Sequence, residues 1–387
     1  MATNNNDKTL NVPPLRFPEF SGEWEEHTLS EYLEFKNGLN PDAKRIGGGL
    51  PFISVMDILS EGVINYDNIR GKVNATEKEI ECFGVKDGDL LFQRSSETLE
   101  DVGRANVYMD NRTAIYGGFV IRGRKIGNYD PLFFKYLLAT PLARKRTCRM
   151  GAGAQHFNIG QEGLSKISLY FPSIEEQRKI AGFLSLIDER IATQNKIIED
   201  LKKLKSAISE RLFKSVKGST VLLSDLCDIV KGKQINGENL SDSGNYYVMN
   251  GGTEPSGYYD NYNVEANTIS ISEGGNSCGY VQFNTSPFWS GGHCYSIQNI
   301  ADKVDNMYLY HYLKSNEDAI MKLRIGSGLP NIQKKDLAMF KIIVPKIEWQ
   351  IKISTFLSSL ERKAEIEERI QNVMQKQKLY LLQQMFI

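Results

Sequence analysis

The chain has 387 residues, and its 47 Lys and Arg residues are balanced by 47 Asp and Glu residues, so the formal net charge is zero. No overall basic excess marks it as a general nucleic-acid binder, and any such site must be a local patch. Five scattered cysteines, the absence of a membrane-length apolar run and a polar start without a signal-peptide core favour a cytoplasmic protein over an exported or membrane protein.

In chain order, the sequence predicts a tail, a globular unit, a long helix, a second globular unit and a second long helix. The predicted bounds are 1–14 for the disordered tail, 15–172 for the first unit, 173–215 for the first helix, 216–345 for the second unit and 346–387 for the second helix. A chain of this length fits about two domains, each large enough to bury a core.

Each globular unit is expected to mix short strands with helices. Apolar or aromatic runs broken by Gly, Asn and Asp predict strands at 50–55, 89–92, 119–122, 268–272 and 280–283. Helical stretches are expected at 131–146 and 306–323. The fold class that follows is α+β.

An internal repeat decides the architecture. Residues 171–213 align without a gap with residues 344–386, so that Pro172 matches Pro345 and Gln177 matches Gln350. Two related modules, each followed by the same kind of helix, therefore make up the chain.

Weaker landmarks extend the repeat into the globular units. Residues 134–137 parallel 310–313, and glycines recur as Gly117-Gly118 with Gly291-Gly292 and as Gly151 and Gly153 with Gly326 and Gly328. Such glycines either allow close backbone approach to a phosphate or permit positive φ in a turn, and the sequence leaves both open. Between the landmarks the halves share little, which indicates a common scaffold with two different interiors.

Both long helices carry a heptad seam, with matching polar positions at Gln194 and Glu367 and at Lys205 and Lys378. Roughly forty helical residues would span about 60 Å, which suits a spacer formed by pairing the two helices. The competing interpretation is that each helix packs only on its own unit. The apolar seam members are Ile180, Leu184, Ile187, Ile191, Ile198, Leu201, Ile208 and Leu212 in the first helix and Ile353, Leu357, Leu360, Met374, Leu381 and Met385 in the second.

Four phenylalanines near this seam, Phe183, Phe356, Phe213 and Phe386, fit equally well to partner contacts or to packing within the chain. Phe183 and Phe356 are counted with the seam as candidate docking residues.

Side chains suited to DNA gather in the loops of both units. Arg and Gln can make bidentate contacts with base edges, while Lys and Ser suit phosphates. For any one of them, a solvated charge or a turn former is the competing interpretation. The candidates are Lys36, Gln93, Arg94, Ser95, Arg104, Arg122, Arg124, Arg146 and Arg149 in the first unit, and Lys231, Lys233, Gln234, Asn250, Asn276, His293 and Arg324 in the second.

No catalytic constellation is visible. A P-loop is absent, the four histidines lack zinc-ligand spacing, and the glycines at 151–154 do not follow a buried strand as a cofactor loop would. We therefore expect no enzyme activity, no metal and no cofactor in this chain.

The chain resembles the specificity (S) subunit of type I restriction-modification systems. The residues that carry the resemblance are the segment 15–20 with Trp24, the run 172–184 (PSIEEQRKIAGFL) and the copy of that run from Pro345. The copy departs from the first run at residues 348–350, where EWQ replaces EEQ.

The resemblance implies that each globular unit is a target-recognition domain for one half of a bipartite double-stranded DNA site. It also implies that the helices pair as an antiparallel coiled coil with a pseudo-two-fold axis, set the spacer and dock two methyltransferase subunits. S-adenosylmethionine, ATP and magnesium would then be bound by those partners and by restriction-translocase subunits. Two other hypotheses stay open at this point, a coiled-coil adaptor that binds only proteins and a self-sufficient divergent nuclease.

Overall fold

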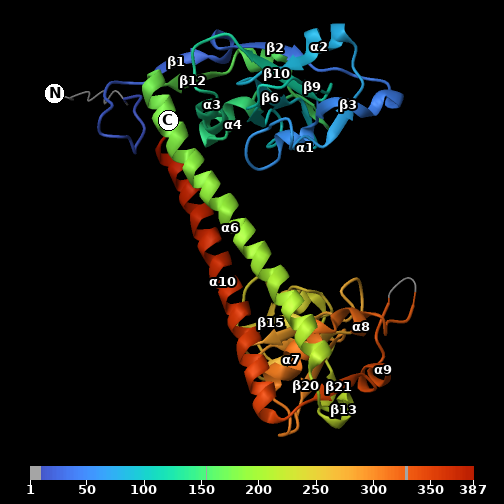
Figure 1. Cartoon of the computed structure of the whole chain (residues 1–387). Coiled ribbons are helices and arrows are strands. Elements are labelled where there is room, and N and C mark those ends of the chain that lie inside the picture. Colours follow the sequence, from blue (N-terminus) through green and yellow to red (C-terminus); the bar gives the residue numbers. More distant parts are fainter. Residues whose placement is uncertain (1–9, 154, 327–329) are drawn as a thin grey trace, which may run out of the picture. The chain divides into compact units, whose positions relative to one another are not determined.

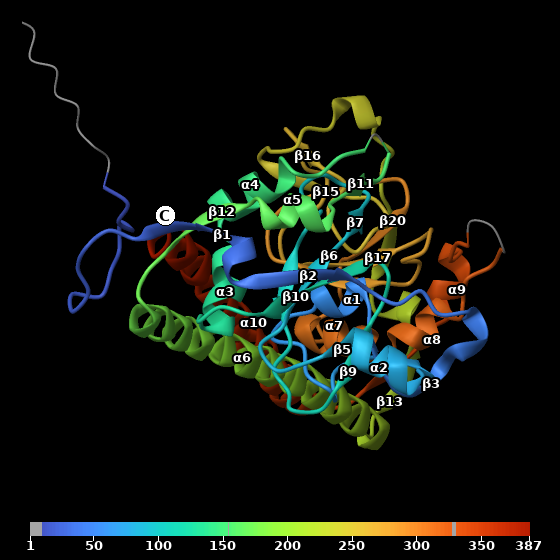
Figure 2. The ribbon, with the colours of Figure 1, turned by 90° about the horizontal axis from the view of Figure 1, so that it is seen from above.

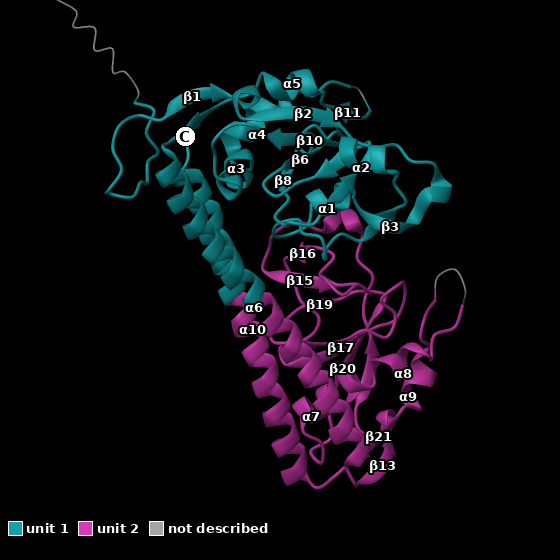
Figure 3. Cartoon of the chain, turned by 45° about the horizontal axis from the view of Figure 1, so that its top comes forward, with its two compact units in different colours: residues 1–194, 370–387 teal, residues 195–369 magenta. Residues whose placement is uncertain are grey.

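The computed structural model of the chain describes residues 10–153, 155–326 and 330–387. It contains two long helices, α6 (Ile174–Ser215) and α10 (Ile347–Gln384), together with two mixed regions of strands and short helices (Figure 1). The chain divides into two compact units: residues 1–194 with 370–387 form unit 1, and residues 195–369 form unit 2 (Figure 3). Each unit takes one mixed region and part of each long helix. The predicted fold class is confirmed.

In the described part of unit 1, the strands form two four-stranded sheets and two short pairs. The first sheet is antiparallel, in the order β2 (Leu33–Asn37), β10 (Val120–Lys125), β6 (Leu90–Gln93) and β8 (Ala105–Val107). The second has the order β4 (Gly71–Val73), β3 (Ile46–Ile53), β9 (Ala114–Tyr116) and β5 (Gly84–Val85). The short pairs are β1 (Glu25–Thr28) with β12 (Ser168–Phe171) and β7 (Ser95–Ser96) with β11 (Phe157–Asn158).

Short helices complete unit 1, and α3 lies between the first sheet and α6 (Figure 2). Phe133 and Phe134 of α3 are buried in one cluster with Phe92 of the sheet and Leu184 of α6. The core therefore joins sheet, short helix and long helix. The helices are α1 (Val55–Ile58), α2 (Glu77–Phe83), α3 (Pro131–Leu138), α4 (Pro141–Cys148) and α5 (Gln161–Ser165), with 3₁₀ turns at Leu29–Glu31 and Ala43–Arg45.

Unit 2 repeats this plan with a smaller second sheet. Its main sheet is antiparallel, in the order β14 (Asp228–Lys231), β20 (Cys294–Gln298), β17 (Thr268–Ser272) and β18 (Val281–Asn284). A second sheet has the order β16 (Tyr258–Tyr259), β15 (Tyr246–Met249) and β19 (Trp289–Ser290), and β13 (Ser219–Leu222) pairs with β21 (Lys341–Val344). The short helices are α7 (Asn306–Ser315), α8 (Glu317–Met321) and α9 (Lys334–Ala338), with 3₁₀ turns at Leu223–Asp225 and Gly237–Asn239.

The two predicted helical stretches are each broken into two helices. The stretch 131–146 ends its first helix at Leu138, because Thr140 caps a new helix through a hydrogen bond from the N–H of Ala143 and Pro141 occupies its first turn. The stretch 306–323 is divided at Asn316, which lies between α7 and α8.

The predicted tail is described only in part. Residues 1–9 lie outside the described residues, but Asn11 and Leu15 have defined contacts: the carbonyl of Asn11 accepts from the N–H of Trp24 at 2.8 Å, and the N–H of Leu15 donates to the carbonyl of Gln384 at 2.8 Å. The segment that follows Leu10 is therefore packed against unit 1 rather than disordered. Trp24 itself is buried with its ring edge-to-face against Phe386.

The long helices run antiparallel within each unit. In unit 1 the Lys378 ammonium pairs with Asp188, and in unit 2 the Lys205 ammonium pairs with Glu361 at 2.6 Å. Asp188 and Glu361 are themselves equivalent in the repeat, so the same pair is made twice with the helices exchanged. No helix in the described ranges is both long and apolar enough to cross a membrane.

Candidate nucleic-acid interface

In each unit, the glycine that follows the first strand of the main sheet lies against the backbone of a repeated glycine. A Cβ added to Gly38 would lie 2.1 Å from the carbonyl oxygen of Gly117, and a Cβ added to Gly232 would lie 2.1 Å from that of Gly291. Both contacts bring the segment after the first strand of the main sheet against the segment that enters the second. Gly38 and Gly232 are thus required by close approach within the chain.

Two glycines of the other repeated set, Gly153 and Gly326, fit the turn interpretation, whereas Gly151 does not have a positive φ. Gly153 has φ +144° and Gly326 has φ +103°, values that favour glycine. Gly328 lies outside the described residues.

Two of the predicted DNA-binding arginines lie in the sheet region of unit 1, where Arg122 is buried and Arg124 is half-buried. The Arg122 guanidinium donates to the carbonyl of Gly84 at 2.8 Å, and the Arg124 guanidinium donates to the same oxygen at 2.6 Å. Arg124 also lies 3.4 Å from the carboxylate of Asp89, whose pKa is raised by burial. These contacts give both arginines a role in joining the two sheets.

Three further candidates in unit 1 are engaged within the chain. The Lys36 ammonium lies 2.9 Å from the Cys82 sulfur, and the buried Gln93 amide donates to the carbonyl two residues on at 2.9 Å. Arg146 forms an ion pair with Glu26 at 2.7 Å. Their geometry favours structural roles over free contacts.

The remaining candidates of unit 1 reach the surface. Arg94 is half-buried and its guanidinium donates to the carbonyl of Gly118 at 3.3 Å. Ser95 follows directly and donates to the side-chain oxygen of Asn158 on β11. Arg104 and Arg149 are exposed, and Arg104 pairs with the carboxylate three residues earlier. Arg94 and Ser95 are therefore the two candidates placed together at the end of β6.

In unit 2 the structure gathers three candidates around a buried carboxylate. The Lys231 ammonium donates to Glu273 Oε1 at 2.7 Å, and the Tyr295 hydroxyl donates to the same oxygen at 3.0 Å. His293 Nδ1 lies 4.0 Å from Glu273 Oε2, and the His293 N–H donates to the Asn250 side chain at 3.2 Å. Burial and the adjacent carboxylate raise the pKa of Tyr295, so its hydroxyl stays protonated as a donor.

The other candidates of unit 2, Lys233, Gln234, Asn276 and Arg324, are exposed. Lys233 and Gln234 continue the chain from β14, and a Cβ on Gly292 would lie 2.3 Å from Gln234 Oε1, so this pair lies close to the carboxylate cluster. Within the described ranges, no hydrogen bond or ion pair joins Asn276 or Arg324 to it.

Sequence reasoning missed Glu273, although its neighbours were singled out. The structure makes Glu273 the counterpart of Arg94, because the N–H of Arg94 donates to the Phe119 carbonyl at 2.9 Å and the N–H of Glu273 donates to the His293 carbonyl at 2.9 Å. Among the residues that the structure describes, no three His, Cys, Asp or Glu side chains gather where they could hold a metal ion.

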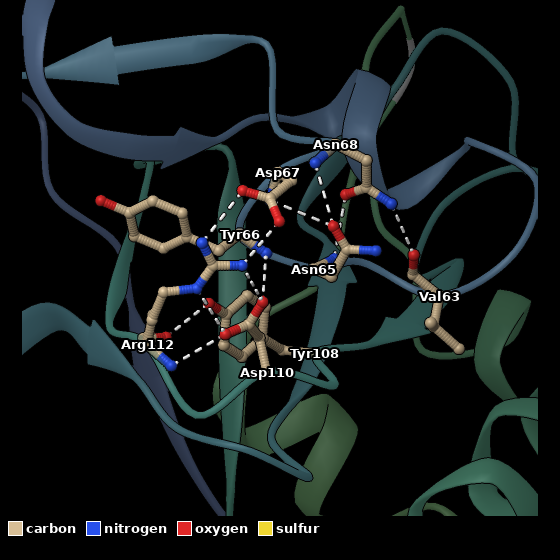
Figure 4. Close-up of polar contacts among 8 residues, drawn as sticks. All are labelled: Val63, Asn65, Tyr66, Asp67, Asn68, Tyr108, Asp110 and Arg112. Carbon is tan, nitrogen blue, oxygen red and sulfur yellow. Dashed lines mark hydrogen bonds and ion pairs between the residues drawn. The ribbon is translucent and has the colours of Figure 1, made fainter.

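A separate arginine cluster in unit 1 fixes a loop (Figure 4). Arg112 pairs with Asp67 at 2.7 Å and with Asp110 at 2.8 Å, and its guanidinium lies over the Tyr66 ring at 4.3 Å from the centroid. Hydrogen bonds from Arg112 hold the pKa of Asp110 below its ordinary value. Asn65 caps the same loop by accepting from the N–H of Asn68 at 3.0 Å. Arg112 is thus a loop anchor.

The predicted seam residues lie at buried or half-buried positions along both long helices. At the helix ends they also enter the globular cores: Leu184 and Met385 join the core of unit 1, and Ile353 and Leu357 join that of unit 2. Phe213 and Phe386 are buried in those cores as well, which settles their role as packing within the chain.

Other apolar side chains of the long helices point to solvent. Phe183 and Phe356, the two predicted docking phenylalanines outside the seam, are partly exposed, although Phe183 contacts Phe17 edge-to-face at 5.9 Å between centroids. The exposed set also includes Leu186, Ile197, Leu204, Trp349, Ile366, Ile370, Val373, Leu379 and Tyr380. These exposed side chains, unlike the buried or half-buried seam residues, are available on the surface of the long helices.

A buried glutamine near the start of each long helix forms hydrogen bonds with the backbone of the globular region. Gln177 Oε1 accepts from the N–H of Asp130 at 3.1 Å, and Gln350 Oε1 accepts from the N–H of Asp305 at 2.8 Å. Asp130 and Asp305 cap α3 and α7, so these helices start at equivalent points. The predicted parallel between residues 134–137 and 310–313 is therefore shifted by one residue.

A family model described as the type I restriction modification DNA specificity domain matches residues 21–203 and 217–376. The type I restriction enzyme MjaVIII specificity subunit of Methanocaldococcus jannaschii is 24% identical over 408 residues, covering 94% of this chain and 91% of that protein.

Solved structures show the same fold. A crystal structure of the type I restriction-modification system S subunit from M. genitalium matches with a TM-score of 0.66 at 18% identity, covering 97% of this chain and 99% of the other. A chain from a structure on complex assembly and conformational transition of the type I R-M system matches with a TM-score of 0.57 at 15% identity, covering 95% and 98%.

Proposed function

The chain belongs to the type I restriction-modification DNA specificity family, and from this premise we propose that each of its units reads one half of a bipartite, asymmetric DNA site. The observation that carries the proposal is a backbone hydrogen bond that both units make at the end of a main-sheet strand, between residues whose side chains differ in the two units. Arg94 and Phe119 form it in unit 1, and Glu273 and His293 form it in unit 2. Side chains of different hydrogen-bonding character on one scaffold would select different bases.

The paired long helices would set the spacer between the two half-sites. Helices of 42 and 38 residues are much longer than packing on a small domain requires. Two half-buried ion pairs, Lys378 with Asp188 and Lys205 with Glu361, would hold a single register. A fixed register would translate into a fixed spacing on the DNA.

The exposed apolar side chains of the long helices would dock two methyltransferase subunits. Trp349, Ile370 and Tyr380 are examples of large side chains left in solvent on α10, where a soluble helix ordinarily carries polar residues. The chain itself would bind no cofactor. S-adenosylmethionine would be bound by the methyltransferase subunits, and ATP and magnesium by restriction-translocase subunits joined to the same complex.

Neutral net charge is compatible with this function, because most phosphate contacts can come from the partner subunits. The chain would then supply selection of bases, and the complex would supply much of the affinity.

The test compares three samples on a library of random DNA with S-adenosylmethionine: this chain alone, the cognate methyltransferase subunit alone, and the two together. Only the mixture should methylate adenine, and the methylated molecules should share one split motif. Cutting or methylation by the chain alone would replace the proposal with a self-sufficient enzyme. A stable mixture that methylates without sequence preference would replace it with a protein-binding adaptor.

A further inference from the structure

The carboxylate cluster of unit 2 has one oxygen that its surroundings leave without a partner. Glu273 is buried, with 9% of its side chain exposed, and its Oε1 accepts from Lys231 and Tyr295. Its Oε2 is buried and accepts no hydrogen bond from the residues that the structure describes. An unpaired buried carboxylate oxygen is costly, so a donor is expected to reach it in the working state of the protein.

His293 is a side chain able to supply that donor. Its Nδ1 lies 4.0 Å from Oε2, and a shift of about 1 Å would bring the pair to ordinary hydrogen-bond distance. The rest of the ring faces solvent, since 63% of the His293 side chain is exposed. The histidine therefore connects a buried acceptor on one side with the surface on the other.

The backbone around His293 holds it in place. Its N–H donates to the Asn250 side chain, and a Cβ on Gly251, which has φ +86°, would lie 3.1 Å from the His293 Cβ. Gly274 also borders the ring, since a Cβ there would lie in ordinary contact with Nδ1, at 3.7 Å. The loop is thus shaped to present this imidazole.

Glu273 and His293 also lie where the side chains of the two repeats differ. The carbonyl of Glu273 accepts from the N–H of Ile332 at 2.8 Å, as that of Arg94 accepts from Ile159 at 2.9 Å. The counterpart of His293 is Phe119, which is 68% exposed. Backbone contacts are therefore preserved at this site while both side chains change.

We propose that His293, positioned by Glu273, reads a base with an exocyclic amino group, adenine or cytosine, in the major groove of the half-site bound by unit 2. In the neutral imidazole, a carboxylate that accepts from Nδ1 keeps the ring proton on Nδ1. Nε2 then faces outward as an acceptor, and adenine N6 and cytosine N4 are the donors in the major groove. The inference rests on the proposed function, because it presumes that unit 2 binds DNA.

Two substitutions test the two roles separately, with adenine methylation mapped after co-expression with the cognate methyltransferase. His293→Ala should weaken discrimination at one position of one half-site by roughly tenfold, the loss of about one good base contact. The other half-site serves as an internal control for folding and assembly. His156→Ala, which removes another exposed histidine, should leave the half-site of unit 2 unchanged.

Glu273→Gln gives the sharper result. Lys231 and Tyr295 are donors, so they would hold the amide oxygen of the substituted side chain at the position that Oε1 occupies now. The amide NH₂ would then face His293 Nδ1 and favour the tautomer that carries its proton on Nε2. Nε2–H would then point outward as a donor, and preference at the same position should move from adenine or cytosine toward guanine or thymine. If Glu273 had only a structural role, Glu273→Gln would lower the stability of unit 2 without changing the base preference.

The outcomes distinguish the proposed role of His293 from the proposed function of the whole chain. A wild-type map without any split motif contradicts the proposed function. A wild-type split motif that both variants reproduce with full discrimination overturns the inference alone. Binding of oligonucleotides that carry each base at the affected position distinguishes adenine from cytosine.

Discussion

At single positions, the strongest constraints in the structure fall on buried charged groups that depend on one or two partners. Glu176 is buried, and both of its oxygens accept from the Arg16 guanidinium at 2.7 Å. Arg16 belongs to the segment after Leu10 that packs on unit 1. A buried carboxylate is therefore neutralised by a residue about 160 positions away in the sequence.

Removing Arg16 should destabilise unit 1. Arg16→Ala leaves the Glu176 carboxylate buried without its partner, and loss of one member of a buried pair costs about 3 kcal/mol. Urea unfolding followed by circular dichroism measures the change. Glu19→Gln is the matched control, because it breaks the exposed Lys179–Glu19 pair nearby and should leave the midpoint unchanged. Equal shifts for the two variants would contradict the assigned role.

His311 should make unit 2 sensitive to acid. Burial lowers the pKa of this imidazole to about 4, while its Nε2 lies 2.9 Å from the Ser358 hydroxyl. Below pH 6.5 this histidine binds a proton in the unfolded chain but not in the folded chain. Its contribution to the free energy of unfolding is therefore fully present above pH 6.5 and is lost as the pH drops toward 4.

His311→Gln removes this titration and should reduce the loss of unfolding free energy between those two pH values by up to about 3 kcal/mol. The measurement is urea unfolding of both proteins at a series of pH values. Parallel curves for the two proteins would show that His311 does not titrate as described.

At the scale of elements, the long helices were the most predictable part of the fold. A proline before each helix, a repeated sequence and an unbroken heptad together specify α6 and α10, and their starts at Ile174 and Ile347 lie within one residue of the predicted ones. The shorter helices were predicted less well, because capping by Thr140 and the break at Asn316 are local effects that apolar periodicity does not report.

The buried glutamines offer a matched pair of tests at this scale. Gln350 accepts from the N–H of Asp305 and donates to the carbonyls of Lys303 and Pro345, so Gln350→Leu leaves three backbone groups without a partner. Such a change should cost about 3 kcal/mol and speed amide exchange at the start of α7. Gln177→Leu should do the same at the start of α3. Equal responses of both helices to either variant would contradict a local lock.

The candidate interface was only partly predictable for a physical reason. Basic residue types in loops pointed to Arg94, Lys231 and His293, which the structure leaves half-buried or exposed at the strand ends. The same reasoning could not separate them from Arg122, whose guanidinium is turned inward to a backbone carbonyl. Exposure depends on contacts between segments distant in sequence, and these were not readable from composition.

At the scale of the whole molecule, the last residues of the second long helix pack in the unit that contains the start of the first long helix. Leu382, Met385 and Phe386 pack in the core of unit 1, and Leu15 bonds to the carbonyl of Gln384. Phe213, the counterpart of Phe386, packs in the core of unit 2. Each unit thus takes one end of each long helix, an arrangement that the linear order of modules did not by itself reveal.

The measurement that tests the central claim most directly is a genome-wide map of methylated adenines in a methylation-free host that expresses this chain with its cognate methyltransferase subunit. The account predicts one split motif with two unlike halves and a constant spacer, absent when this chain is omitted. Replacing unit 1's residues 25–171 with those of a relative of different specificity should change one half only. An active complex that produces no new motif, or one unsplit motif, would contradict it.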